Sequence, residues 1–385
     1  MAILRRGTVA TLVVVLGAAS PVVAAEEAEA AACTRLHPEL ARGFSLTGWF
    51  DERTPRPPDF AVLAELRARG MTHIRLPIAA ESVMTRFTPA AAVATRRRQI
   101  AAGIDALLAR GYAVVVDLHG GGRLGELFAQ NPEAAQAAVV QAWTVLGPIV
   151  EQRAARRVSA EILNEPPLGD AAWTAMQGKI VAAVRPIMPT ATLVVSTGGP
   201  QRVERLTAST PIADRNTVYA VHYYDPMAFT HQGAEWIRPD PIGWLHDVPF
   251  PISVSDPRLA SLVRQFRTAG QIRVADYVAS LMHRSFGPAD VRGHMRALGA
   301  WSRMHGRAVV LGEFGVYRAR VASTHRTAWL AAVTTAANEN CLGWTHWDYR
   351  DGFGLVDGAT GKPDEATLAG LAGITRAKGD RPEDD

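Results

Sequence analysis

Two glutamates stand in sequence contexts that suit acid–base chemistry. Glu165 follows Asn164 in Leu-Asn-Glu-Pro, and Glu313 lies in Gly-Glu-Phe-Gly. Two facing carboxyl groups, one protonated and one ionised, can act together as a general acid and a base or nucleophile. The sequence therefore predicts a catalytic carboxyl pair, provided that the fold brings these two positions together.

Other polar and aromatic side chains come at the ends of apolar runs. They are Arg75 in His-Ile-Arg-Leu-Pro, Asp117 and His119 in Val-Asp-Leu-His-Gly, His222 and Tyr224 in His-Tyr-Tyr, and Trp347 in His-Trp-Asp-Tyr. A purely structural strand of an α/β barrel needs only apolar packing there, so polar strand ends indicate a site. Residues two apart on a strand face the same way, which groups Asp117 with His119 and His222 with Tyr224.

The elements that must position these residues alternate regularly. Short β-branched runs and longer helical patterns follow one another, which predicts repeated parallel βαβ units. The expected strands are 43–48, 73–78, 112–119, 158–165, 192–197, 217–224, 308–315 and 342–347. The turn after the first strand lacks the Gly-x-Gly-x-x-Gly of an open dinucleotide-binding sheet. Eight such strands favour a closed (β/α)₈ barrel, the TIM barrel, over a doubly wound sheet.

One connection is much longer than the others. Residues 225–285, a long loop insertion between the sixth strand and the sixth helix of the barrel, are rich in proline and aromatic residues, including Trp236, Trp244 and Phe250. A long connection at this end of a barrel strand predicts a wall or lid over a substrate cleft. We expect residues 26–375 to form a single catalytic domain and 376–385 to be a disordered tail.

The first 25 residues have the layout of a secretory signal peptide. Arg5 and Arg6 precede an uncharged stretch that has an apolar centre and closes on small residues before Glu26. An uncleaved membrane anchor is the alternative, because the stretch approaches the length that spans a bilayer. We expect cleavage, since alanine, glycine and Pro21 dilute the apolar segment. The mature protein would then be exported, periplasmic or extracellular, and not bound to a membrane.

Two cysteines are present, Cys33 before the first expected strand and Cys341 before the last. First and last strands are neighbours in a closed barrel, so a disulfide between these residues is geometrically sensible. Two unpaired thiols are the alternative.

Composition narrows the functional class. Hydrophobic residues make up 48% of the chain and charged residues 20%, which is typical of a globular protein with a large core. The formal charge is only +4 and the arginines are scattered, so we expect no nucleic-acid partner. We expect a monomer without cofactor or metal ion.

The ordered set of motifs resembles glycoside hydrolase family 5, the cellulase-type family of the retaining (β/α)₈ clan, from Gly43 to about Asp357. The resemblance implies that Glu165 is the acid/base and Glu313 the nucleophile. It implies substrate-binding roles for Arg75, His119, Asn164, His222, Tyr224 and Trp347. In that family the asparagine would bond the sugar 2-hydroxyl and the tryptophan would stack beneath the ring. Trp236 is a candidate outer sugar platform.

The resemblance also sets expectations for charge and substrate. Arg75 and Tyr224 should keep Glu313 ionised, and the charge of Glu313 should keep Glu165 protonated. The substrate would be a β-glucan or cellulose-type polysaccharide or oligosaccharide, with mannan or short β-glucosides as alternatives. Ser45 and Thr47 depart from the family pattern after the first strand begins.

Two other classes of function remain open. A metal-dependent hydrolase could use Asp117, His119 and His222 as ligands, but this leaves both strand-end glutamates unexplained. A non-catalytic carbohydrate-binding barrel would normally have lost one of the two glutamates, and both are present.

Overall fold

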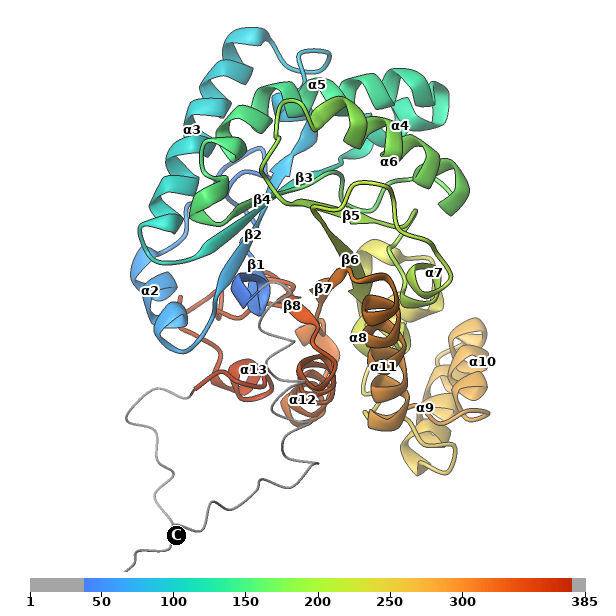
Figure 1. Cartoon of the computed structure of the whole chain (residues 1–385). Coiled ribbons are helices and arrows are strands. Elements are labelled where there is room, and N and C mark those ends of the chain that lie inside the picture. The colour runs from blue at the N-terminus through green and yellow to red at the C-terminus, as the bar shows by residue number, and fades with distance from the viewer. Residues whose placement is uncertain (1–37, 376–385) are drawn as a thin grey trace, which may run out of the picture.

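Eight parallel strands close into a barrel in the computed structural model of the protein, which describes residues 38–375 (Figure 1). Each strand pairs with the next, and the first pairs with the last. The strands are β1 (Arg42–Ser45), β2 (His73–Ala79), β3 (Ala113–His119), β4 (Val158–Glu161), β5 (Leu193–Ser196), β6 (Thr217–Tyr223), β7 (Ala308–Phe314) and β8 (Gly343–His346). The predicted (β/α)₈ barrel is confirmed.

Helices surround this barrel (Figure 1). They include α2 (Phe60–Ala68), α3 (Ala90–Leu108), α4 (Gly122–Gln130), α5 (Pro132–Glu151), α6 (Asp170–Val184), α7 (Val203–Thr207), α11 (Pro288–His305), α12 (Ser323–Glu339) and α13 (Glu365–Ala369). Local sequence explains their starts: the Asp59 side chain accepts a hydrogen bond from the Ala61 amide, and Asn131 caps α5 in the same way. Between residues 38 and 375, no helix has both the length and the apolar character needed to cross a bilayer.

Three predictions fall on the chain ends. The signal peptide (1–25), Cys33 and the tail (376–385) lie outside the described residues. Cys341 lies two residues before β8 and is not a free thiol. Its pairing with Cys33 stays a prediction.

Strand alternation sends one set of side chains outward against the helices and the other into the barrel, where apolar residues give way to polar ones toward the carboxyl ends. On β3, Val114, Val116 and Leu118 pack in the large core between barrel and helices. Val115 belongs to a separate cluster formed by residues of β3, β5, β6 and β7, and Asp117 follows it two residues later. Because the side-chain period of a strand is two, polar residues that continue the inward series meet at the carboxyl ends of the strands.

An irregularity in β7 turns Glu313 inward. Val221 pairs with Leu311, but the next residue of β6, His222, pairs with Glu313, so Gly312 is the extra residue of a bulge. A Cβ on Gly312 would lie 3.3 Å from the Cβ of Ala220, closer than nearly all such contacts. The bulge therefore places the Glu313 carboxylate on the same side as the inward residues of β6.

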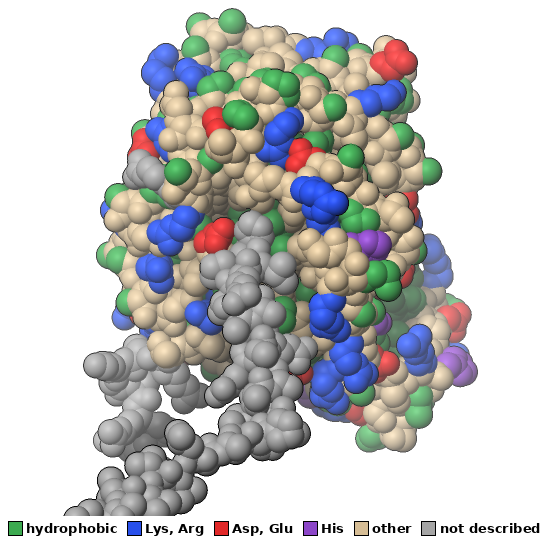
Figure 2. Space-filling view, in the orientation of Figure 1, with side chains coloured by type: hydrophobic (Ala, Val, Ile, Leu, Met, Phe, Trp, Pro, Cys, Tyr) green, Lys and Arg blue, Asp and Glu red, His purple; other side chains and the backbone are tan. Residues whose placement is uncertain are grey.

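The insertion after β6 is helical rather than an extended loop. It contains α8 (Met227–Thr230), η4 (Glu235–Ile237), η5 (Pro241–Trp244), α9 (Pro257–Thr268) and α10 (Ile272–Leu281). The last two helices pack on each other, with Leu262, Phe266 and Val278 in a hydrophobic cluster separate from the barrel core. They project from the side of the molecule beyond α11 (Figure 1 and Figure 2). The residues of the insertion that line the cleft all lie between 225 and 237, so most of the insertion does not form the predicted wall.

Candidate active site

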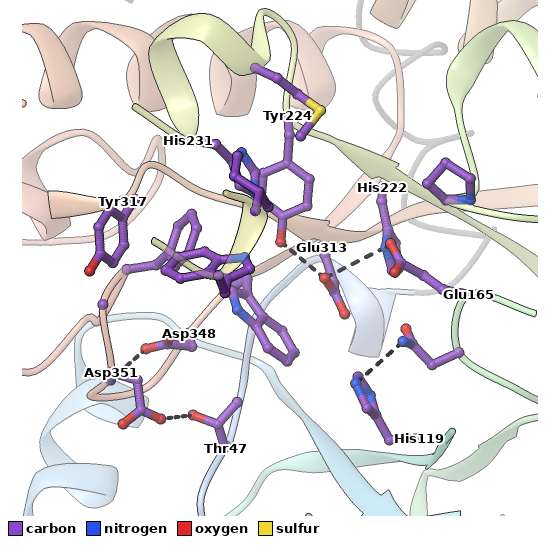
Figure 3. A pocket seen from close by; sticks show the side chains of 18 of the residues that line it. Thr47, His119, Glu165, His222, Tyr224, His231, Glu313, Tyr317, Asp348 and Asp351 are labelled. Atoms are coloured by element: carbon purple, nitrogen blue, oxygen red, sulfur yellow. Dashed lines mark hydrogen bonds and ion pairs between the residues drawn. The ribbon is translucent and has the colours of Figure 1, made fainter. Parts of the chain in front are cut away.

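A cavity of about 610 Å³ opens at the carboxyl ends of the strands (Figure 3). Eight of the nine residues predicted from sequence as catalytic or substrate-binding line it: His119, Asn164, Glu165, His222, Tyr224, Trp236, Glu313 and Trp347. Arg75 differs, because it is 1% exposed and lies beneath the cavity. The structure therefore brings the predicted set together, with Arg75 supporting the other residues from below.

The two glutamates approach each other closely. Carboxylate oxygens of Glu165 and Glu313 and the Nδ1 atom of His222 all lie within 4.8 Å of one another. His222 Nδ1 is 3.0 Å from Glu165 Oε1 and 3.6 Å from Glu313 Oε2. This carboxylate separation is well below the roughly 6.5–9.5 Å that an inverting glycosidase needs for its water.

Arg75 is the centre of a buried charge network. Its guanidinium donates to Glu313 Oε1 at 2.8 Å, to Glu161 at 2.7 and 3.0 Å, and to Asn164 Oδ1 at 2.7 Å, and it lies 3.0 Å from Asp117. Burial disfavours the charge of Arg75, but the surrounding carboxylates outweigh it and hold the pKa well above its usual range. The network fixes the orientation of both Glu313 and Asn164.

Glu161 was missed by sequence reasoning. It is 2% exposed, and burial raises the pKa of its carboxyl group despite the guanidinium beside it. A signal existed, because Glu161 is the one charged residue of β4 (Val-Ser-Ala-Glu), and a charge on a buried strand needs a partner. Its partner is Arg75, from which it accepts two hydrogen bonds.

Tyr224 holds the second oxygen of the expected nucleophile. Its hydroxyl donates to Glu313 Oε2 at 2.9 Å (Figure 3). Burial, followed by the negative charge of Glu313, raises the pKa of Tyr224 well above its usual range, so the phenol remains a donor. The ring packs edge-on against His231, with 4.8 Å between ring centroids.

Glu165 comes after β4 ends, in a left-handed backbone conformation with φ of 38°. Its side chain is 43% exposed in the cavity. Burial raises the pKa of Glu165, but the hydrogen bond and charge of His222 outweigh burial, and the net pKa lies below its usual range. Burial alone would lower the pKa of His222, but the charges of Glu313 and Glu165 outweigh burial, and the net pKa of His222 is raised. The direction of the pKa shift of Glu165 is opposite to the one expected from the charge of Glu313, and its cause is the neighbouring His222.

An aromatic floor lies beside the carboxylates. The ring of Trp347 is nearly parallel to that of His119, with centroids 5.9 Å apart and planes 18° from parallel. His119 Nδ1 contacts Asp117 at 2.9 Å, and its Nε2 faces the Asn164 amide at 3.4 Å. Trp236 is 59% exposed on another wall, which suits a surface that a sugar ring could cover.

Residues 34–352 match the family model for cellulase, glycosyl hydrolase family 5. The chain belongs to this family. Endoglucanase 3 of Fibrobacter succinogenes (strain ATCC 19169 / S85) is 27% identical over 209 residues, which are 51% of this chain and 30% of that relative. The chain thus spans less than a third of the length of this curated relative.

Solved structures share the fold. An endoglucanase superposes with a TM-score of 0.70 at 18% identity, covering 88% of this chain and 99% of its own. Cel5A of Thermotoga maritima in complex with cellobiose gives 0.68 at 22% identity, covering 87% and 98%. Subunit Z of the Clostridioides difficile cellulose synthase gives 0.68 at 19%, covering 86% and 99%. At these identities the likeness concerns the fold alone.

The cleft of this family 5 member has an acidic wall that sequence reasoning missed. Asp51, Glu52, Asp348 and Asp351 line it. Asp351 accepts a hydrogen bond from Thr47 Oγ1 at 3.0 Å, and Asp348 accepts one from the Asp351 amide at 2.8 Å. Burial raises the pKa of Asp348 to about 7 and that of Asp51 to about 6. These residues follow β1 and β8 in loops, where no strand pattern marks them.

The metal-ligand set considered from the sequence is not arranged for a metal ion. The Asp117 carboxylate is already engaged by Arg75 and His119. Within residues 38–375, the group close enough to share an ion is Glu165, His222 and Glu313. The Arg75 guanidinium 2.8 Å from Glu313 would repel a cation there.

Proposed function

We propose that this protein hydrolyses internal β-glycosidic bonds of a β-glucan or cellulose-type chain with retention of configuration, using Glu165 as acid/base and Glu313 as nucleophile. The observation that carries the proposal is the approach of the two carboxylates to within 4.8 Å at the carboxyl edge of the barrel. That spacing suits a covalent glycosyl-enzyme intermediate.

In the first half-reaction, the Glu313 carboxylate attacks the anomeric carbon while Glu165 protonates the departing glycosidic oxygen. Arg75 and Tyr224 hold one oxygen each of the Glu313 carboxylate, so the nucleophile is already oriented. Asn164 lies where its amide can bond the 2-hydroxyl, and Trp347 offers an aromatic face to the sugar ring.

Protonation of Glu165 is then coupled to substrate binding. In the free protein its side chain is 43% exposed and its pKa is lowered by His222. A sugar in the cavity displaces water from Glu165, and desolvation favours the neutral carboxyl form. Once the glycosyl ester forms, the charge of Glu313 is lost, the acidity of Glu165 rises, and it can take a proton from the attacking water.

The substrate class is supported by family membership and by what related proteins bind. Structures of Thermotoga maritima Cel5A contain cellobiose or mannotriose, so mannan is the second candidate polymer. The layout of residues 1–25 supports export to the periplasm or the medium.

The test is hydrolysis of β-glucans, mannan and aryl β-glycosides by the wild type, Glu165→Ala and Glu313→Ala, with azide as an external nucleophile. We expect both variants to lose activity on the polymers. Azide should rescue Glu165→Ala and give a β-glycosyl azide, because it attacks the intermediate in place of water. It should rescue Glu313→Ala and give an α-glycosyl azide, because it replaces the nucleophile. Wild-type turnover by either variant would overturn the assignment.

A further inference from the structure

A second groove, of about 870 Å³, adjoins the catalytic cavity. It lies over the end of β2, between η2 (Ala80–Val83), the first turns of α3 and the start of α4. Asp51 and Glu52 line both the catalytic cavity and this groove. The two hollows therefore meet at these two residues of the acidic wall.

The chemistry of the site fixes which end of a bound chain would enter this groove. Glu165 protonates the leaving group, so the leaving part of the chain lies toward the wall beyond Glu165, where Pro200 and Arg202 follow β5. The part retained on Glu313 lies toward Trp347 and the β1 to β3 side. Asp51 is on this side, because Arg56 joins its neighbour Glu52 to Asp351, which lies across the cavity from Glu165 (Figure 3). The groove thus continues the binding site in the glycone direction.

The groove walls carry groups that bond sugar hydroxyls. Hydroxyl and amide side chains line it, among them Ser82, Thr88, Thr95 and Gln99, together with three arginines. Two of these arginines are held over aromatic rings: Arg96 lies 5.9 Å from the centroid of Phe50, and Arg123 lies 4.6 Å from that of Phe87. Their donors are therefore positioned before a ligand arrives.

Small residues leave the floor of the groove open. Ala91 and Ala92 line it from the exposed face of α3, one turn before Thr95 and Arg96. At the junction with the catalytic cavity, Glu52 is held by Arg56 at 2.6 Å. Its carboxylate is thus paired rather than left as a free negative charge in the path of a neutral chain.

We propose that this groove binds the distal glycone units of the same neutral β-glycan chain whose scissile bond lies in the catalytic cavity. It makes the enzyme selective for long chains. The inference rests on the proposed function and extends it: a binding site that continues beyond the catalytic cavity accepts an unbroken polymer and supports cleavage at internal bonds. Disaccharides and aryl glycosides would not reach it.

A substitution that blocks the groove sterically tests the groove separately from the catalytic residues. Ala92→Trp places an indole in the groove, whereas Ala94→Trp adds the same side chain to an exposed position of α3 that does not line it. Both substitutions carry the same loss of helix propensity, so Ala94→Trp is the matched control for folding. The assay is kcat/KM for oligosaccharides of the preferred polymer, from disaccharide to hexasaccharide, together with an aryl β-glycoside.

For the wild type, kcat/KM should keep rising with chain length beyond the units that the catalytic cavity holds. In Ala92→Trp, kcat/KM for the hexasaccharide should fall about tenfold, the factor expected when the hydrogen bonds of one sugar unit are lost. The value of kcat/KM for the aryl glycoside should not change. Ala94→Trp should match the wild type throughout. If folded Ala92→Trp keeps full activity on the hexasaccharide, the proposed role of the groove is overturned, but the proposed function stands. No turnover of any substrate by the wild type overturns both.

Discussion

Removing one oxygen atom tests how far the nucleophile depends on its phenol partner. In Tyr224→Phe the ring stays and keeps its packing on His231 at 4.8 Å, while the 2.9 Å hydrogen bond to Glu313 Oε2 is lost. A hydrogen bond to a charged acceptor contributes about 1.5–3 kcal/mol. Each 1.36 kcal/mol is roughly a factor of ten in rate. We therefore expect kcat/KM for an aryl β-glycoside to fall about tenfold to a hundredfold.

The control for this prediction is Tyr317→Phe. Tyr317 lines the same cavity and packs edge-on against Trp236 at 4.9 Å, and it makes no hydrogen bond to either glutamate among the described residues. It should keep nearly wild-type activity on the aryl glycoside. Glu313 retains its bond to Arg75 in both variants, so thermal stability should change little. If Tyr224→Phe keeps the wild-type kcat/KM, the phenol does not hold the nucleophile and the reasoning is refuted.

Three further outcomes are expected. His222→Phe removes the donor that lowers the pKa of Glu165, so Glu165 should keep its proton to higher pH. The alkaline limb of the profile of kcat/KM against pH should therefore move to higher pH, and a limb that does not move contradicts this role of His222. Burial raises the pKa of Glu161 above 4.5, so the folded protein holds this proton more tightly than the unfolded chain does. The resulting stability is present at acid pH and is lost as the pH rises through that pKa. In urea unfolding, the wild type should therefore lose stability relative to Glu161→Gln from acid to neutral pH, and a gain would count against the assignment. Exhaustive EDTA treatment should leave hydrolysis unchanged, whereas loss restored by one divalent ion would favour the metal-dependent alternative.

The barrel could be predicted because alternation of apolar strands and helices is a local property of the sequence. All eight predicted strands are present, with ends that differ by a few residues. The largest difference is β4, which was expected to reach Glu165 but ends at Glu161. Residues Ile162 and Leu163 still pack in the core beyond it, so their apolar character extended the predicted strand. The helices α9 and α10 were missed because proline and aromatic residues around them favoured a loop.

The membership of the site could also be predicted, but its charges could not. Strand ends of a parallel barrel meet at one edge, so the types of the strand-end residues were enough to gather Glu165, His222 and Glu313. Which neighbour controls Glu165 depends on a distance of 3.0 Å to His222, and no sequence pattern contains that distance. Arg75 was expected to act on Glu313, but its partner Glu161 was hidden for the same reason, since it joins Arg75 from another strand.

The separate core of α9 and α10 bears on how this protein can vary. These helices bury Phe266 and Val278 in a cluster apart from the barrel core, and Met227 and Ile237, which line the cleft, pack against it. The insertion contributes to the lining of the cleft only between residues 225 and 237. A local opening of this pair would expose its amides to exchange while the barrel strands stay closed. The sequence of α9 and α10 can change, or another segment can replace these helices, with little effect on the carboxylate pair. The insertion is thus the part of the chain where a lineage can acquire new surface properties while its chemistry is conserved.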